Sequence, residues 1–187
     1  MSAKGIAGRA VLIDWYAWAR SQDRTVNTMS SDAIPFSELI QTLEHQGMSL
    51  SSFRPGDIMV VRFGYTKQYQ ELAEPQRMQL HEKYKSYKPE NIGVQPSKSL
   101  LKFLWDSKIS AVAGDSRSFE VWPCEQLDWH LHEWLIAGWG MPIGELFDLE
   151  ELSRKASETK RYTFFLTSSP MNVRCNIVPM LFTRYIH

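Results

Sequence analysis

Four short apolar runs limit the folds open to this chain more than any other feature. They are Ala10–Asp14, Ile58–Arg62, Ala111–Gly114 and Tyr162–Thr167. Continuous apolar runs of about four to eight residues, bounded by turn-forming or charged residues, are typical of strands buried on both faces. Segments with helical spacing separate these runs. Strands that alternate with helices predict an α/β domain with a partly parallel sheet.

Helical signals lie between the first three runs. Leu39, Ile40 and Leu43 recur at helical spacing, and Gly47 is placed to end that helix. Ser97 is a good N-cap for a second helix just before the third run. The apolar stripe expected on this second helix consists of Leu100, Leu101, Leu104 and Trp105.

A polar segment, residues 66–87, lies between these two helices. It can form a helix that is interrupted at Pro75, because proline removes a backbone donor and clashes with the preceding turn. His81 and the Lys-Tyr repeats belong to this segment. We expect it to form a solvated surface or a lid.

The pattern continues after the third run. A helix is expected around His132–Ile136, followed by an extended Met141–Ile143. Asp148 is placed to cap a further helix, with Glu151 at the capping-box position. The residues of that helix expected to face inward are Leu149, Leu152 and Ala156.

Length and charge restrict the class of protein. The chain has 187 residues with 21 basic and 21 acidic side chains, so we expect one domain over 1–187. Balanced, scattered charges provide no field that recruits nucleic acid or an anionic membrane. No apolar run is long enough for a membrane span or a secretory signal, and Cys124 and Cys175 lack metal-ligand spacing. These features predict a cytoplasmic protein without nucleic-acid or membrane partners.

Aromatic residues are abundant in this chain, with seven Trp, seven Tyr and nine Phe. Such residues can fill a bulky core and a subunit interface. They can also line a pocket for a small molecule. The sequence leaves both interpretations open.

Two candidate site residues follow the third apolar run. Asp115 stands directly after that strand, where open α/β sheets place their ligands. The alternative is a turn residue that bonds its own backbone. Ser118 can make a polar contact in the same cleft, but no Gly-x-Ser-x-Gly elbow marks it as a nucleophile.

Two further candidates, His132 and Glu145, flank the next apolar segment. His132 lies on the helix side of Leu135 and Ile136, so it can be a core histidine instead of a ligand. His130, two residues earlier, is expected to face another direction and to serve a different place. A buried Glu145 must be paired, protonated or bound to a metal.

These residues belong to a longer ordered pattern. It consists of Gly56-Asp-Ile-Met-Val-Val-Arg-Phe-Gly64, Gly93-Val94, Ala111-Val-Ala-Gly-Asp-Ser-Arg-Ser118 and the segment from His132 to Leu149. The pattern resembles the cyclase family that includes metal-dependent kynurenine formamidases and isatin hydrolases. The segment from His132 to Leu149 is similar to the family's filamentous-fungal branch. Its sequence is His-Glu-Trp-Leu-Ile-Ala-Gly-Trp-Gly-Met-Pro-Ile-Gly-Glu-Leu-Phe-Asp-Leu. The resemblance extends to about Val173.

The resemblance implies a fold, a reaction and a set of roles. The fold is the family's swivelling β/β/α arrangement, a mixed sheet flanked by helices, assembled as a homo-oligomer. The reaction is metal-dependent hydrolysis of an amide or lactone in a small aromatic or cyclic substrate, as in the arylformamidases of tryptophan catabolism. The implied roles are His132 and Glu145 as ligands of zinc or manganese, Asp115 and Ser118 as catalytic residues, and Phe119 and Trp139 as substrate-binding residues.

Two departures from the family pattern leave three hypotheses open. The family's ligand segment, His-x-Gly-Thr-His-x-Asp-x-Pro, does not occur in the sequence, which predicts an N-terminally truncated domain. Residues 171–187 lack the family's closing pattern and are expected to form a divergent tail. The chain can be a metal-dependent hydrolase, a non-catalytic remnant that keeps a ligand cleft or interaction surface, or a fragment of a longer gene product.

Overall fold

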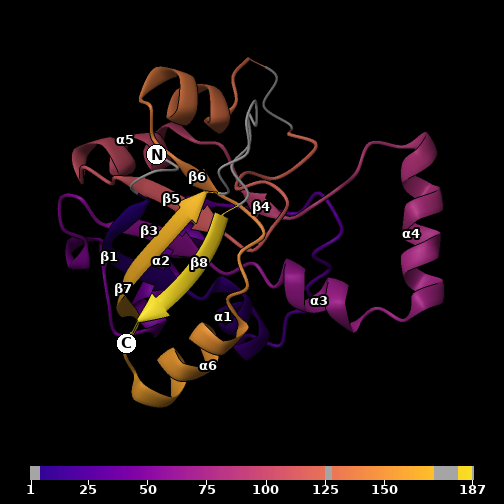
Figure 1. The fold of residues 1–187 in the computed structure, drawn as a ribbon, viewed down its shortest axis with the longest axis horizontal. Coiled ribbons are helices and arrows are strands. Elements are labelled where there is room, and N and C mark those ends of the chain that lie inside the picture. Colours follow the sequence, from indigo (N-terminus) through magenta and orange to yellow (C-terminus); the bar gives the residue numbers. More distant parts are fainter. Residues whose placement is uncertain (1–4, 125–127, 171–180, 187) are drawn as a thin grey trace.

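A mixed β-sheet forms the centre of the structure (Figure 1). The computed structural model describes residues 5–124, 128–170 and 181–186. Within them the strand order is β6-β5-β3-β1-β7-β8, in which the first four strands run parallel and β7 and β8 are antiparallel to their neighbours. The strands of this sheet are β1 (Ile6–Ile13), β3 (Ile58–Val61), β5 (Ala111–Gly114), β6 (Ile143–Gly144), β7 (Thr163–Pro170) and β8 (Leu181–Ile186). A separate short parallel pair joins β2 (Ala33–Ile34) to β4 (Gly93–Val94).

Helices flank the sheet, which confirms the expected mixed α/β architecture. The α-helices are α1 (Trp15–Ser21), α2 (Phe36–His45), α3 (Tyr65–Glu71), α4 (Glu74–Ser86), α5 (Lys98–Asp106) and α6 (Glu150–Thr159). A 3-10 turn covers Leu50–Ser52, and a π-helical turn, η2, covers Glu133–Gly138.

Alternate residues of the strands pack into two separate cores. Val11 and Ile13 of β1 lie in the larger core, together with buried residues of α2 and α5. Ala10 and Leu12 of the same strand lie in a second core, where α6 contributes Leu152. Because both faces of the sheet are buried there, β3, β5 and the second half of β1 (Ala10–Ile13) consist of apolar residues and glycine, and this explains the continuous apolar runs.

Two helices differ in detail from the sequence expectation. Trp105, expected on the inward stripe of α5, is 62 % exposed and packs its ring against Trp139, with 5.1 Å between the ring centroids. It lies in the last turn of the helix, where this second tryptophan offers a closer apolar partner than the core does. Helix α6 begins at Glu150 with Leu149, and not the expected Asp148, at the N-cap position, although the Asp148 carboxylate accepts the N–H of Glu150 at 3.2 Å. The expected inward residues of α6 are buried.

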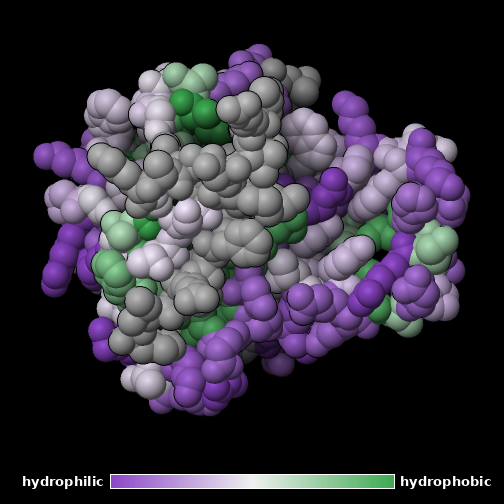
Figure 2. All heavy atoms as spheres, viewed as in Figure 1, coloured by the Kyte–Doolittle hydropathy of each residue, from purple (hydrophilic) through white to green (hydrophobic). Residues whose placement is uncertain are grey.

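The polar segment forms two helices rather than one interrupted helix. α3 ends at Glu71 and α4 begins at Glu74, with Pro75 in the first turn of α4, where its missing N–H would have no helical partner. α4 has no buried residue, projects from the body of the molecule (Figure 1) and carries polar side chains over most of its surface (Figure 2). The expected solvated surface is confirmed, whereas a lid function stays a prediction.

The expected divergent tail is described only in part. Its residues 181–186 form β8, which pairs with β7 at one edge of the sheet. Residues 171–180 and 187, and with them Cys175, lie outside the described residues. Within the described ranges, no helix combines the length and the apolar character needed to cross a membrane.

A buried arginine joins the ends of three elements. Arg62, directly after β3, donates from Nη1 to Asp14 Oδ1 at 2.9 Å and from Nε to Glu150 Oε1 at 2.8 Å. Asp14 also accepts the N–H of Ala17 at the start of α1 and the hydroxyl hydrogen of Ser153 in α6. This network therefore fixes the carboxyl ends of β1 and β3 against α1 and α6.

Replacing this arginine tests how much the network stabilises the fold. In Arg62→Met, the buried Asp14 carboxylate loses its cation, and removing one partner of a buried pair costs about 3–5 kcal/mol of unfolding free energy. Lys102→Met is the matched control, because its pair with Asp106 is exposed and such pairs contribute at most about 1 kcal/mol. Urea unfolding followed by tryptophan fluorescence measures both. Equal losses in the two variants would contradict the assignment.

Candidate functional site

The site begins where β5 ends. Asp115 follows Gly114 and is fully buried, and its carboxylate accepts the backbone N–H of Phe63 at 2.5 Å and of Gly64 at 2.8 Å. Burial raises the pKa of Asp115 to about 7, against the opposing effect of these hydrogen bonds. Asp115 thus ties the end of β5 to the turn after β3. The loop that follows it, residues 116–120, is held close to that turn.

A histidine held between two carboxylates forms the centre of the site. His132 Nδ1 lies 2.7 Å from Glu120 Oε1, and its Nε2 lies 3.0 Å from Glu145 Oε1. Glu120 is only 2 % exposed and also accepts the N–H groups of Leu131 and His132. Glu145 Oε1 accepts the N–H of Phe119 at 3.2 Å. Each carboxylate is therefore positioned by the backbone as well as by the imidazole.

The two carboxylates control the charge of the histidine. Burial disfavours the imidazolium, but hydrogen bonds to Glu120 and Glu145 outweigh burial and raise the pKa of His132 to about 9. Burial likewise works to raise the pKa of Glu120, yet its bonds to His132 and to the backbone lower it overall. The two carboxylates therefore favour the imidazolium form of His132.

A cavity of about 430 Å³ opens beside this centre. It is lined by Arg117, Ser118, Glu120, Trp122, His130, His132, Glu133 and Glu145. The expectation that His130 and His132 serve different places was wrong, because His130 lies before the helical residues and helical spacing does not apply to it. His132 is also not a core histidine, since its side chain is 35 % exposed.

The structure brings three of the six expected site residues together. Ser118 lines the cavity with His132 and Glu145, and its hydroxyl donates to the Glu120 carbonyl at 2.6 Å and accepts from Asn91 Nδ2 at 2.9 Å. Asp115 instead faces the turn after β3 and is not among the residues that line the cavity. Its catalytic role stays a prediction.

The two aromatic candidates lie apart from this cavity. Phe119 is buried, and its ring packs edge-on against Phe63 with 6.1 Å between centroids. Trp139 lines a different hollow of about 400 Å³, beside Trp105. Neither ring lines the cavity beside His132, and substrate binding by either stays a prediction.

Sequence reasoning missed Glu120, the residue that orients His132. Its signal was a carboxylate between the apolar Phe119 and Val121, both of which are buried. A charged residue inside such a run must be paired, because an isolated buried charge is strongly disfavoured. The missing information was its partner, since His132 is twelve residues away in sequence.

The centre supplies two donors that suit zinc or manganese. Glu120 on Nδ1 is the kind of carboxylate that orients a metal-bound histidine. His132 Nε2 and Glu145 Oε1, however, face each other at 3.0 Å, so the imidazole must lose a proton before Nε2 can bind a metal. Catalytic zinc sites normally use three protein ligands. Among the described residues, no group of three His, Cys, Asp or Glu side chains is placed to hold a metal. These residues alone therefore do not make a complete catalytic metal site.

The charge state of His132 gives a direct test of this geometry. In chelator-treated protein we expect the imidazole to titrate near pH 9 instead of 6.5. The raised pKa means that its contribution to the free energy of unfolding is complete below pH 6.5 and is lost as the pH rises to about 9. NMR of the imidazole carbon-bound protons measures the midpoint. Glu145→Gln should lower it, and an identical midpoint in this variant would contradict the arrangement.

Comparison with known proteins identifies the fold. No family model matches the chain, and no curated protein matches it. A solved structure described as a novel cyclase matches with a TM-score of 0.72 at 23 % sequence identity. The match covers 98 % of this chain and 55 % of that chain, so this chain spans about half the length of that structure. The protein therefore has the fold of the matched part of this cyclase. This likeness confirms the expected fold, a mixed sheet flanked by helices.

Proposed function

We propose that the chain belongs to the cyclase family and takes part in hydrolysis or ring closure at the carbonyl carbon of a small aromatic or cyclic amide or lactone. The observation that carries this proposal is the His132 centre, in which two carboxylates orient one imidazole beside a cavity of about 430 Å³. The fold likeness to a cyclase supports it. As part of the same proposal, the protein is a cytoplasmic homo-oligomer, and its reaction resembles that of arylformamidases.

Glu145 is the group best placed to move a proton. Its Oε1 contacts His132 and Phe119, while its Oε2 accepts no hydrogen bond from any described residue. A water beside Glu145 can lose a proton to this carboxylate as its oxygen attacks the substrate carbonyl carbon. When the carbon–nitrogen or carbon–oxygen bond breaks, Glu145 returns this proton to the leaving group, which restores the carboxylate.

Zinc or manganese belongs to this proposal through the family resemblance. His132 and Glu145 would hold the ion, and a further ligand would have to come from outside the described residues. A bound metal of this kind lowers the pKa of water and polarises a carbonyl.

The incomplete ligand set also favours a second candidate function. Both ring nitrogens of His132 are already occupied by carboxylates. A non-catalytic module of the same fold, which binds a ligand or a partner in this cleft, needs no metal. This second candidate predicts no turnover with either metal.

Turnover separates the two candidates. We expect wild-type protein supplied with zinc or manganese to hydrolyse N-formylkynurenine, and His132→Ala or Glu145→Ala to lower the rate at least about 100-fold, because a positioned proton-transfer group contributes that much. His45→Ala, an exposed histidine at the end of α2, is the matched control. Product formation is followed by chromatography. No wild-type turnover would favour the non-catalytic module, and turnover unchanged in both variants would exclude this site.

Metal retention tests the ligand count independently of substrate. Because two protein ligands hold zinc poorly, we expect protein loaded with zinc or manganese to keep a substoichiometric amount after dialysis. Atomic emission of the dialysed protein gives the metal content. Stoichiometric metal that disappears in His132→Ala would show that the chain supplies the further ligand itself.

A further inference from the structure

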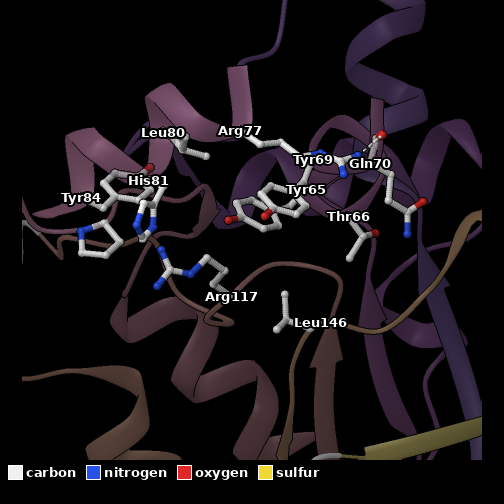
Figure 3. A pocket seen from close by; sticks show the side chains of 11 residues that line it. Tyr65, Thr66, Tyr69, Gln70, Arg77, Leu80, His81, Tyr84, Arg117 and Leu146 are labelled. Carbon is white, nitrogen blue, oxygen red and sulfur yellow. Dashed lines mark hydrogen bonds between the residues drawn. The ribbon is translucent and has the colours of Figure 1, made fainter. Parts of the chain in front are cut away.

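A second cavity, of about 470 Å³, lies between the projecting helix α4, helix α3 and the loop after β5 (Figure 3). We call it the tyrosine cavity. Its size is within the range of small-molecule sites. The residues that determine its chemistry are Tyr65, Tyr69, Tyr84, Arg77, Arg117 and His81.

The tyrosine cavity is positively charged. It contains two arginines and no acidic residue, although the whole chain is neutral. Among the described residues, no carboxylate forms an ion pair with Arg77 or Arg117. Arg77 Nη2 donates to the Gln70 carbonyl at 2.8 Å, but its Nε is shielded from solvent and has no hydrogen-bond partner in the described part of the chain. Donors of this kind suit an anionic group.

Aromatic rings supply the rest of the lining. The rings of Tyr65 and Tyr69 are nearly parallel, with an angle of 5° between them. Arg77 lies 5.6 Å from the centre of the Tyr69 ring, and Arg117 lies 5.9 Å from that of Tyr84. Figure 3 shows the guanidinium of Arg117 near Tyr84, to one side of the Tyr65 and Tyr69 rings. The cavity thus presents flat apolar faces next to guanidinium groups.

We propose that the tyrosine cavity binds a small ligand that consists of a planar aromatic ring carrying one anionic group, a carboxylate or a phosphate. The arginines bind the anion, for which the planar guanidinium offers paired donors. The tyrosine rings contact the aromatic part. This site goes beyond the proposed function, because it uses neither His132 nor Glu145. Arg117 lines both cavities, so the two sites are neighbours.

Binding of simple probes tests the charge and the ring separately. Isothermal titration calorimetry of the full chain compares benzoate and phenyl phosphate with neutral benzamide and with cyclohexanecarboxylate, which lacks an aromatic ring. We expect at least one aromatic anion to bind at a single site and about tenfold more tightly than benzamide, since a hydrogen bond to a charged group contributes that much. It should also bind more tightly than cyclohexanecarboxylate. The tighter of the two anions identifies the anionic group.

Matched variants locate the binding. Arg117→Gln and Arg77→Gln should each weaken binding of the aromatic anion about tenfold. Arg20→Gln, on an exposed position of α1, should leave it unchanged. His132→Ala should also leave it unchanged, which separates this site from the proposed catalytic function. Circular dichroism verifies that the variants fold.

Several results would overturn the proposal. These are benzamide or cyclohexanecarboxylate binding as tightly as the aromatic anions, unchanged binding in both cavity variants, or no binding of either anion at millimolar concentration.

Discussion

The buried Asp115 carboxylate is the contact on which both cavities depend. It accepts the N–H groups of Phe63 and Gly64, so it joins the end of β5 to the turn after β3. Gly64 has φ +85° and is the N-cap of α3, and a side chain there would meet the Tyr16 ring at 2.4 Å. A residue other than glycine would therefore be strained at this position, which restricts the backbone conformation of the turn. After the turn, α3 lies along the tyrosine cavity, and the loop that carries Arg117 lies between the two cavities.

Two buried carboxylates close in sequence have opposite electrostatic environments. Burial raises the pKa of Asp115 and outweighs the opposing effects of its backbone hydrogen bonds and of the Arg62 charge. The pKa of Glu120 falls, despite its burial, because it contacts the imidazole of His132. Asp115 holds two backbone segments together, whereas Glu120 stabilises positive charge on the side chain of His132, which faces a cavity. Environments that push two pKa values apart often separate such roles.

Sequence patterns predicted the sheet well and the site in part. The continuous apolar runs identified β1, β3 and β5, because both faces of the sheet are covered at Ala10–Ile13, Ile58–Val61 and Ala111–Gly114. The run Tyr162–Thr167 identified β7, although that strand also contains Thr and Ser and its Phe165 is 48 % exposed. His132 and Glu145 were predicted to belong to one site, and their side chains are in contact, whereas their role as metal ligands stays a prediction. Glu120 was missed because its pairing is a tertiary contact that no local spacing encodes. The positions of the Phe119 and Trp139 rings were equally beyond local patterns, since both depend on packing against distant aromatic residues.

The two cavities differ in the charged side chains that line them. The cavity beside His132 is lined by carboxylates from Glu120, Glu133 and Glu145 together with Arg117 and His132, so it carries charges of both signs. The tyrosine cavity has arginines without carboxylates and attracts an anion. Arg117 lines both. The two cavities therefore differ in the charge of their linings, and Arg117 lies at their common border.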